Sequence, residues 1–312
     1  MTTQRITLAV VGLGDIARKA HLPVLAARSD VDVIGLANRS GQDIAALAAQ
    51  YRFPLQATTV DQVIALRPVA ALVLTASGSH ANLTCRLLEA GIAVYLEKPM
   101  ALDVASARAV TDCARRTGQL VMVGFNRRYA PLYQRLAALF PDQTAGQCHL
   151  VKARHARETW RSPADVVWDD VIHLIDLSRW LMGDPDRVHA AVQCNADGAF
   201  AGLSALLHYP DGRSCTLSQP IRGGGMRERV EVFGAGVSAW VDDLEALHVQ
   251  HDGVIDTHTH DPWTSTLTKR GFTAALDHFL DCLRSGRPLI QSAQDALKSH
   301  ELAQSILDAA GV

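Results

Sequence analysis

Short runs of consecutive apolar residues alternate with segments of helical periodicity over the first 124 residues. Such runs are typical of strands buried on both faces, and apolar residues recurring every three to four positions are typical of helices. The predicted strands are 6–11, 31–37, 70–75, 92–96 and 119–123. The predicted helices are 15–28, 42–51, 81–90 and 104–116, the last with Asp103 as its N-cap. This alternation predicts an α/β domain with a parallel, doubly wound sheet.

The pattern changes after residue 124, where single apolar and polar residues alternate over short segments. A period of two is typical of strands with one buried face, and turn signals such as Pro210-Asp211-Gly212 separate the segments. The strands predicted here are 147–155, 188–194, 204–209, 214–220, 228–233 and 238–241, and the helices are 131–140, 170–182, 272–284 and 295–310. Successive hairpins predict a mainly antiparallel sheet. The chain therefore divides into domains 1–124 and 125–312, with the last helix able to pack back on the first.

Composition narrows the class of protein. The 312 residues are 48% hydrophobic and 20% charged, which is typical of a globular domain, and Lys+Arg 30 against Asp+Glu 32 leaves a net charge of −2. This balance does not favour a nucleic-acid partner, and no apolar run reaches membrane-spanning length. The N-terminus leads directly into the first strand, so no signal peptide is expected. The six cysteines are scattered, which favours free thiols and a cytoplasmic location.

Residues 12–17 read G-L-G-D-I-A and follow the first predicted strand. Gly12 permits a tight turn, Gly14 lets a pyrophosphate approach the main chain, and Ala17 lets the helix pack close to the strand. The helix N-terminus offers free N–H groups to an anion, with Asp15 and Ile16 in its first turn. The sequence therefore predicts a dinucleotide site, and the alternative is an ordinary strand–helix turn.

The residues that end the second predicted strand bear on the choice of cofactor. NAD sites usually carry an acidic residue here for the ribose 2′-hydroxyl, whereas this chain has Asn38, Arg39 and Ser40. A guanidinium and a hydroxyl without a carboxylate suit a 2′-phosphate, so NADP is favoured slightly over NAD. The alternative is an exposed arginine at a helix start.

Ligands of parallel sheets bind beyond the carboxyl ends of the strands, and four polar residues fall at such ends: Thr75, Glu97, Lys98 and Asn126. Lys98, between Glu97 and Pro99, has an ammonium group that can hold a substrate oxygen and stabilise developing negative charge. The alternative is a surface lysine beside a glutamate.

Asp169, His173 and Asp176 form a second group of reactive residues. At 3.6 residues per turn His173 shares a helix face with each aspartate, and a carboxylate beside an imidazole suits general acid–base chemistry. A helix capped by aspartates, with a core histidine, explains the pattern equally well.

Other histidines are less informative. His155, with Arg154 and Arg157 at the end of a predicted strand, either lines a substrate pocket or ends the strand. Predicted surface or loop residues are His248, His251, His258 and His260. The sequence D-T-H-T-H-D has no second ligand cluster to support it, so no metal site is predicted.

Taken together, these motifs resemble the Gfo/Idh/MocA oxidoreductase family over essentially the whole chain. The resemblance rests on G-L-G-D-I-A, His80, E-K-P at 97–99, G-F-N-R-R-Y at 124–129, and Asp169 with His173 and Asp176. The sequences G-F-N-R-R-Y-A-P-L-Y and W-T-S-T-L-T-K-R-G-F are similar to the MviM-type members. Two positions depart from the common pattern, because Asn38 replaces an aspartate and V-V-W-D-D lacks a Gly-Gly pair.

The resemblance implies an N-terminal Rossmann domain and a C-terminal α/β domain with an open, mainly antiparallel sheet, through which subunits form a homodimer or homotetramer. Leu203, Ala205 and Leu207 are expected on the exposed face. The resemblance also implies that Lys98, His173 and Asp169 are catalytic residues. Cofactor binding is expected of Gly12, Gly14, Asp15, Ile16, Asn38, Arg39, Ser40, Thr75, His80, Glu97 and Asn126, and substrate binding of Arg127, His155 and Asp170.

These observations predict an NAD(P)-dependent oxidoreductase acting on a hydroxyl or carbonyl of a small substrate, a sugar, cyclitol or related polyol. A branch of the family instead uses its cofactor transiently, for elimination or glycoside cleavage. The alternative from another class is a catalytically silent sensor or regulatory protein that binds the dinucleotide. The presence of both Lys98 and His173 favours the enzyme.

Overall fold

The structure is a computed structural model that describes residues 5–141, 144–155, 162–221 and 223–312. It divides into two compact units. Unit 1 comprises Met1–Phe125 and Phe272–Lys298, and unit 2 comprises Asn126–Gly271 and Ser299–Val312. The predicted division at 124/125 lies one residue from the first boundary. It placed residues 272–298 in the second domain, whereas they belong to unit 1.

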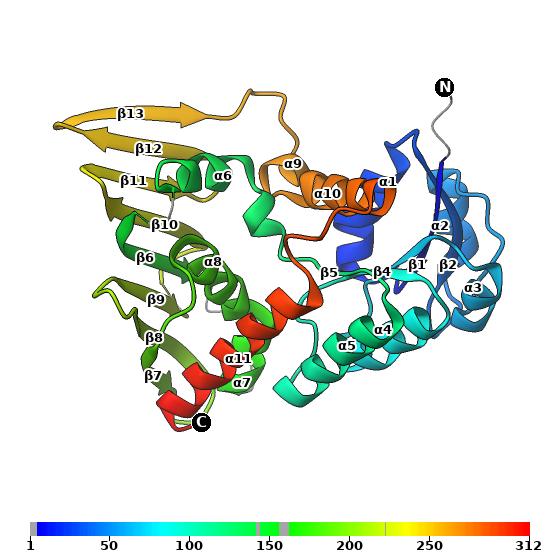
Figure 1. The fold of residues 1–312 in the computed structure, drawn as a ribbon, viewed down its shortest axis with the longest axis horizontal. Coiled ribbons are helices and arrows are strands. Elements are labelled where there is room, and N and C mark those ends of the chain that lie inside the picture. The colour runs from blue at the N-terminus through cyan, green and yellow to red at the C-terminus, as the bar shows by residue number, and fades with distance from the viewer. Residues whose placement is uncertain (1–4, 142–143, 156–161, 222) are drawn as a thin grey trace. The chain divides into compact units, whose positions relative to one another are not determined.

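Among the described residues of unit 1, five strands form one parallel sheet (Figure 1) in the order β2-β1-β3-β4-β5. They are β1 (Ile6–Val11), β2 (Val31–Ala37), β3 (Ala70–Val73), β4 (Ala93–Leu96) and β5 (Val121–Val123). The interior strands β3 and β4 are buried at every position, as expected for strands covered on both faces. The predicted parallel, doubly wound sheet is confirmed.

Helices cover this sheet and follow the predicted order with one addition. They are α1 (Leu22–Ala26), α2 (Ile44–Tyr51), α3 (Val60–Leu66), α4 (His80–Glu89), α5 (Val104–Thr117) and α10 (Phe272–Ser285). Helix α3 was not predicted, although its N-cap Thr59 forms a capping box with Gln62. The first predicted helix begins with a π-helical turn, η1 (Ala17–His21), and a short 3₁₀ turn, η2 (Ser77–Ser79), precedes α4.

In unit 2 the described strands form one eight-stranded sheet in the order β13-β12-β11-β10-β6-β9-β8-β7. They are β6 (Ala145–Ala153), β7 (Arg187–Cys194), β8 (Phe200–His208), β9 (Ser214–Pro220), β10 (Arg227–Gly234), β11 (Val237–Asp242), β12 (Ala246–His251) and β13 (Val254–Thr259). Among the described strands of this sheet, only the neighbours β6 and β9 are parallel, so the mainly antiparallel prediction is confirmed. The hairpin β12–β13 was missed. Of the histidines predicted as surface or loop residues, His248, His251 and His258 lie in its strands, with His251 exposed and the other two half-buried.

One face of this sheet packs on helices, and α8 (Ile172–Met182) lies against β6 and β9 (Figure 1). The other helices are α6 (Pro131–Ala138), α7 (Pro163–Val166), α9 (Thr266–Lys269) and the C-terminal α11 (Ala293–Ala310), with η3 (Asn126–Tyr129) and η5 (Val167–Val171) as short turns. Leu203, Ala205 and Leu207 were expected on the exposed face, and this is wrong. All three are buried, at most 5% exposed, because their face of β8 is the inner one.

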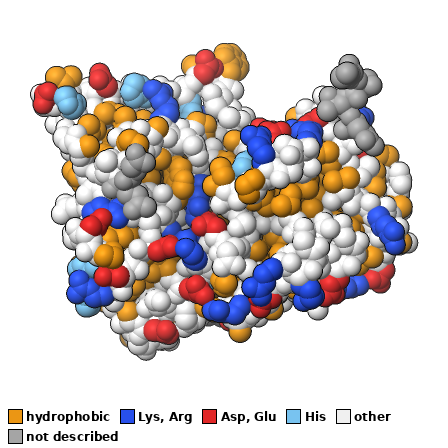
Figure 2. Space-filling model, viewed as in Figure 1, with side chains coloured by type: hydrophobic (Ala, Val, Ile, Leu, Met, Phe, Trp, Pro, Cys, Tyr) orange, Lys and Arg blue, Asp and Glu red, His pale blue; other side chains and the backbone are white. Residues whose placement is uncertain are grey.

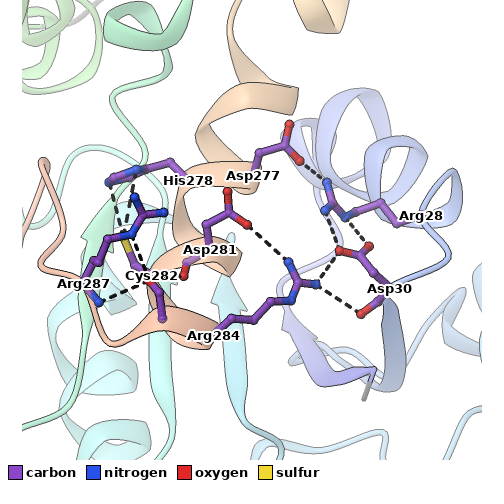
Figure 3. Close-up of polar contacts among 9 residues, drawn as sticks. Arg28, Asp30, Asp277, His278, Asp281, Cys282, Arg284 and Arg287 are labelled. Carbon is purple, nitrogen blue, oxygen red and sulfur yellow. Dashed lines mark hydrogen bonds and ion pairs between the residues drawn. The ribbon is translucent and has the colours of Figure 1, made fainter. Parts of the chain in front are cut away.

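Ion pairs tie α10 into unit 1 and explain why this late segment belongs there. Arg28 donates to both carboxylate oxygens of Asp30 at 2.8 Å and also pairs with Asp277 of α10 (Figure 3). Arg284 of α10 pairs with Asp30 from the other side. The hydrogen bond from Arg28, with help from Arg284, lowers the pKa of Asp30 to about 2. Asp30 thus joins the end of the first helix to a segment some 250 residues further along.

Acidic and basic side chains are mixed over the face shown in Figure 2, so neither sign of charge dominates it. A surface of this kind agrees with the near-neutral net charge of −2. Within the described residues, no helix combines the length and apolarity that crossing a membrane requires.

Candidate active site

The glycine turn after β1 has the geometry that a pyrophosphate needs. Gly12 has φ +99°, and a Cβ there would lie 2.6 Å from the main chain of Leu74 and Thr75, so only glycine fits. A Cβ on Gly14 would meet nothing within 4 Å, so this side of the turn is open. Arg18 donates to the Leu13 carbonyl at 2.8 Å and braces the turn. The turn therefore fits a dinucleotide whose phosphates approach the start of η1.

At the end of β2, the Asn38 side chain closes its own loop. It accepts the Gly41 N–H at 2.6 Å and donates to the Gln42 carbonyl at 2.9 Å. Ser40 accepts the Gln42 N–H at 3.3 Å, and Arg39 is exposed. Arg39 is thus the cationic side chain at the strand end where the ribose of a bound dinucleotide is expected.

Lys98 is the second residue after β4, and its neighbours are fixed inside unit 1. Glu97 is buried, and its carboxylate accepts the Lys98 N–H at 3.1 Å and lies 2.7 Å from Nε2 of His21. His80 is 1% exposed, with its ring nitrogens 2.7 Å from the Pro99 carbonyl and 3.0 Å from the Thr75 carbonyl. The structure therefore turns the side chains of Glu97 and His80 toward the protein, where they hold the strand ends.

Asp169 and His173 lie in unit 2 on consecutive turns. Asp169 belongs to the π-helical turn η5 and is exposed, and His173 belongs to α8 and is 8% exposed. A π turn has i→i+5 hydrogen bonds, so the 3.6-residue spacing used in the prediction does not hold across Asp169 to Val171. Single π turns are frequent at functional sites, and η1 after the glycine turn is a second example.

Asp170 is buried beneath this helix and is the acceptor of several cationic and polar groups. Lys152 of β6 lies 2.5 Å and Arg154 Nε 2.7 Å from its carboxylate, and Gln219 of β9 also donates to it. Burial opposes ionisation, but the Arg154 hydrogen bond and the Lys152 charge outweigh it and lower the pKa of Asp170 below its usual range. Burial also lowers the pKa of Lys152 to about 8, against the attraction of Asp170. Asp170 therefore anchors η5 to the sheet.

Glu228 is a second buried carboxylate on the inner face of the sheet, and it is the register partner of Lys152 on β6. Arg127 donates to both of its oxygens, at 2.8 and 2.9 Å, and the Tyr133 hydroxyl donates at 3.0 Å. Burial raises the pKa of Glu228, but the charges of Arg127 and Lys152 and these hydrogen bonds lower it to about 2. Arg127 and Asp170, both predicted to bind substrate, thus belong to one network of buried ion pairs.

The remaining predicted residues take different positions. Asp176 accepts from Arg128, with Nε to Oδ2 at 2.8 Å, and from Ser299 at 3.0 Å, so this carboxylate fixes η3 and α11 against α8. Asn126 donates to the Arg270 carbonyl at 2.7 Å. His155 is exposed just beyond β6, and Arg157 lies outside the described residues.

Sequence reasoning missed His21, Lys152, Tyr133 and Glu228. A signal existed for two of them. Lys152 lies two residues after the buried Leu150, and Glu228 lies two residues before the buried Val230. Residues two apart in a strand share a face, so both positions face inward. Across the described residues, no three His, Cys, Asp or Glu side chains gather closely enough to hold a metal ion.

Comparison with known proteins assigns the two parts of the chain. Residues 6–125 match an oxidoreductase family with an NAD-binding Rossmann fold, and residues 133–239 match the GFO/IDH/MocA C-terminal domain. The chain belongs to the Gfo/Idh/MocA oxidoreductase family. The predicted family, fold class and oxidoreductase activity are thereby confirmed.

Three relatives show how far this similarity extends. Myo-inositol dehydrogenase Hyg17 of Streptomyces leeuwenhoekii is 30% identical over 253 residues, which cover 73% of this chain and 74% of that protein. A crystal structure of a Gfo/Idh/MocA family oxidoreductase from Vibrio cholerae is 28% identical, with a TM-score of 0.88 over 97% of each chain. The dehydrogenase MviM from Clostridium difficile is 21% identical and has the same fold, with a TM-score of 0.91 over 98% of this chain and 100% of that chain.

The buried pair between Glu228 and Arg127 makes the stability of this Gfo/Idh/MocA protein depend on pH. The pKa of Glu228 is about 2 in the folded protein, below its ordinary value of 4.5, so the stabilisation is complete above pH 4.5 and is lost as pH falls toward 2. Glu228→Gln should therefore lower the free energy of unfolding by about 3 kcal/mol at pH 7 and flatten its fall between pH 5 and 3.

Urea unfolding followed by circular dichroism measures both quantities. Glu231→Gln is the matched control, because Glu231 lies on the same strand but on the other face, 3.3 Å from Arg229. It should change the free energy by less than about 1 kcal/mol. Equal pH dependence in wild type and Glu228→Gln would contradict the assignment.

Proposed function

We propose that this protein is an NAD(P)-dependent dehydrogenase that interconverts a secondary hydroxyl and a carbonyl on a cyclitol, sugar or related polyol. The observation that carries the proposal is the position of Lys98. It follows β4 at the sheet edge where the glycine turn follows β1, and ligands of such sheets bind at this edge. The similarity to a myo-inositol dehydrogenase supports a polyol substrate.

In this proposal the residues of the chain prepare one substrate oxygen for reaction. When bound, the nicotinamide cofactor supplies the hydride acceptor. His173 accepts the proton of the substrate hydroxyl, and Asp169 orients the imidazole ring. The Lys98 ammonium donates a hydrogen bond to the same oxygen and stabilises the negative charge that develops there.

The open glycine turn supports binding of the cofactor pyrophosphate at Gly12 and Gly14, and Asn38, Arg39 and Ser40 are proposed to meet the adenosine ribose. Further residues proposed to line the cofactor, some through the loops that they brace, are Asp15, Ile16, Thr75, His80, Glu97 and Asn126. His155 is proposed to contact substrate directly. Arg127 and Asp170 are proposed to form the floor beneath it through their ion pairs.

Dinucleotide binding depends on the open side of Gly14. Gly14→Asp places a carboxylate beside the cofactor phosphates, so the affinity for NAD⁺ should fall by about a hundredfold or more, the effect of a close like-charge contact. Isothermal titration calorimetry measures it. Gly225→Asp is the matched control, since a Cβ there also meets nothing within 4 Å. Unchanged affinity in a folded Gly14→Asp variant would refute the site.

Cofactor preference depends on Arg39. We expect the wild type to bind NADP⁺ somewhat more tightly than NAD⁺, because the exposed guanidinium can pair with a 2′-phosphate. Arg39→Ala should weaken NADP⁺ binding by about tenfold, the value of one charge-assisted hydrogen bond, and leave NAD⁺ binding almost unchanged. Calorimetric titration with NADP⁺ and with NAD⁺ measures this, and equal losses for the two cofactors would contradict a role of Arg39 in the preference.

Turnover depends on Lys98 and His173 acting as a pair. A panel of cyclitols and sugars with NAD⁺ and NADP⁺ first identifies a substrate. His173→Ala should then lower kcat about a hundredfold or more, and Lys98→Met at least as much, without weakening cofactor binding.

The double variant should be little worse than the poorer single one, because the two residues act on one oxygen. His251→Ala, which changes an exposed histidine of β12, is the control. Near wild-type turnover of His173→Ala between pH 6 and 9 would make His173 a structural residue.

We propose that the protein is cytoplasmic, where its six thiols stay free. We also propose that the outer face of the eight-stranded sheet joins subunits in a homodimer or homotetramer. On this face Trp240 stacks on His248 at 5.0 Å, and Arg229 lies 5.1 Å over the Trp240 ring. Aromatic residues with arginine are typical of interface centres.

Trp240→Glu should therefore release monomers of 33.7 kDa, as measured by light scattering at micromolar concentration, whereas Leu66→Glu on α3 should not. A monomeric wild type would contradict this interface.

A further inference from the structure

The two residues that flank Lys98 are each held by a buried histidine from a different helical segment. Glu97 is held by His21 at the end of η1, and Pro99 is held by His80 at the start of α4. Both histidines are buried, at 2% and 1% exposure. All of these residues belong to unit 1, so the arrangement does not depend on where unit 2 lies.

His21 fixes the main chain of Lys98 through the Glu97 carboxylate. One carboxylate oxygen lies 2.7 Å from His21 Nε2, and the other accepts the Lys98 N–H at 3.1 Å. The His21 ring is confined by Tyr95 and Phe272, whose ring centroids lie 5.3 and 5.6 Å away in edge contacts. A carboxylate that is 5% exposed and bridges two donors has little freedom to move, so the Lys98 amide is fixed as well.

The π turn η1 explains how His21 reaches this position. Its five residues follow the glycine turn directly, and Ala17, Ala20 and His21 are its buried members. Pro23, the second residue of α1, cannot donate a main-chain hydrogen bond into the preceding turn. The wider turn thus directs His21 inward to Glu97, so the helical segment that follows the glycine turn is joined to the residue before Lys98.

His80 joins two strand ends on the other side of Lys98. Nδ1 lies 2.7 Å from the carbonyl after β4, that of Pro99, and Nε2 lies 3.0 Å from the carbonyl after β3, that of Thr75. Carbonyl oxygens only accept hydrogen bonds, so a neutral imidazole donates to one of these two carbonyls and lies beside the other. It holds the segment after β4 at a fixed distance from the neighbouring strand end.

We propose that His21 and His80 are positioning residues for Lys98, and that His21 links the cofactor-binding helix to it. The inference rests on the catalytic role proposed for Lys98. A lysine ammonium ends a flexible four-carbon chain, so its main chain must be fixed if the ammonium is to meet one substrate oxygen. Misplacement by about 1 Å is enough to cost turnover severely. Neither histidine touches substrate in this arrangement, and each acts through Glu97 or Pro99.

The first test needs no substrate. Hydrogen exchange of the Lys98 amide is measured by NMR in wild type and in four variants, His21→Leu, His21→Gln, His80→Leu and His80→Gln. Both leucine variants should speed exchange at Lys98 about fivefold or more, and both glutamine variants, which keep an N–H donor, should restore much of the protection. The Glu97 amide, bonded to the Val73 carbonyl at 3.0 Å, is an internal control that should change little.

His278→Gln is the matched control variant. His278 also lies in unit 1, and it accepts the Ile290 N–H at 3.2 Å, in the segment that follows α10. It should leave the Lys98 amide unchanged. His21→Leu leaves the buried Glu97 charge without its partner. If this variant does not fold, the double variant His21→Leu/Glu97→Gln, which removes the buried charge, is measured in its place. Unchanged Lys98 exchange in the folded leucine variants would overturn the proposal.

The second test separates positioning from general stability. With myo-inositol and NAD⁺ as the probes, both leucine variants should lower kcat about tenfold or more, and in His21→Leu the KM and the dissociation constant of NAD⁺ should stay within twofold. Glutamine should recover kcat. Faster Lys98 exchange in the leucine variants, together with a wild type that turns over no polyol, would support the positioning and refute the proposed reaction. Polyol turnover with unaltered kcat in the leucine variants would refute the positioning alone.

Discussion

The polarity of a parallel sheet is the constraint on which unit 1 depends. All five strands point the same way, so residues that end strands far apart in the sequence are brought to one edge. The glycine turn follows β1, Thr75 follows β3, and Lys98 follows β4 at that edge. At this edge the main chain of Gly12 packs directly against the main chain that follows β3, so any Cβ on Gly12 would collide with it.

In unit 2 buried ion pairs hold η5 and α8, which carry polar residues, against the sheet. Lys152 and Glu228 are register partners on adjacent strands, and both face inward. A buried charge without a partner is costly, so each must be matched. Arg127 and Tyr133 match Glu228, while Asp170 beneath η5 matches Lys152 and Arg154. The turn η5, and with it α8, is thus fixed by ion pairs that disfavour other positions.

The sequence predicted the parallel sheet well, because its strands are buried on both faces and leave an unmistakable apolar run. It predicted the glycine turn for the same kind of reason, since G-x-G-x-x-A acts through local geometry. The π turns were missed, because i→i+5 hydrogen bonding leaves no trace in hydrophobic periodicity. The hairpin β12–β13 was missed because its outer strand is exposed at nearly every position.

The partners of buried charges were hardest to predict from sequence. His21 and Glu97 are 76 residues apart, and Arg127 and Glu228 are 101 apart, so only the folded chain brings them together. Two of these residues were nevertheless assigned by sequence, Glu97 to the cofactor and Arg127 to the substrate. The structure gives both of them partners inside the protein, His21 for Glu97 and Glu228 for Arg127.

The central claim is that Lys98 and His173 act on one substrate oxygen. A crystal structure of the protein with NAD⁺ and a bound polyol tests it most directly. The account predicts the Lys98 ammonium and a His173 ring nitrogen both within about 3.2 Å of the same hydroxyl oxygen. A polyol whose reacting hydroxyl contacts only one of these two residues, or neither, would contradict it.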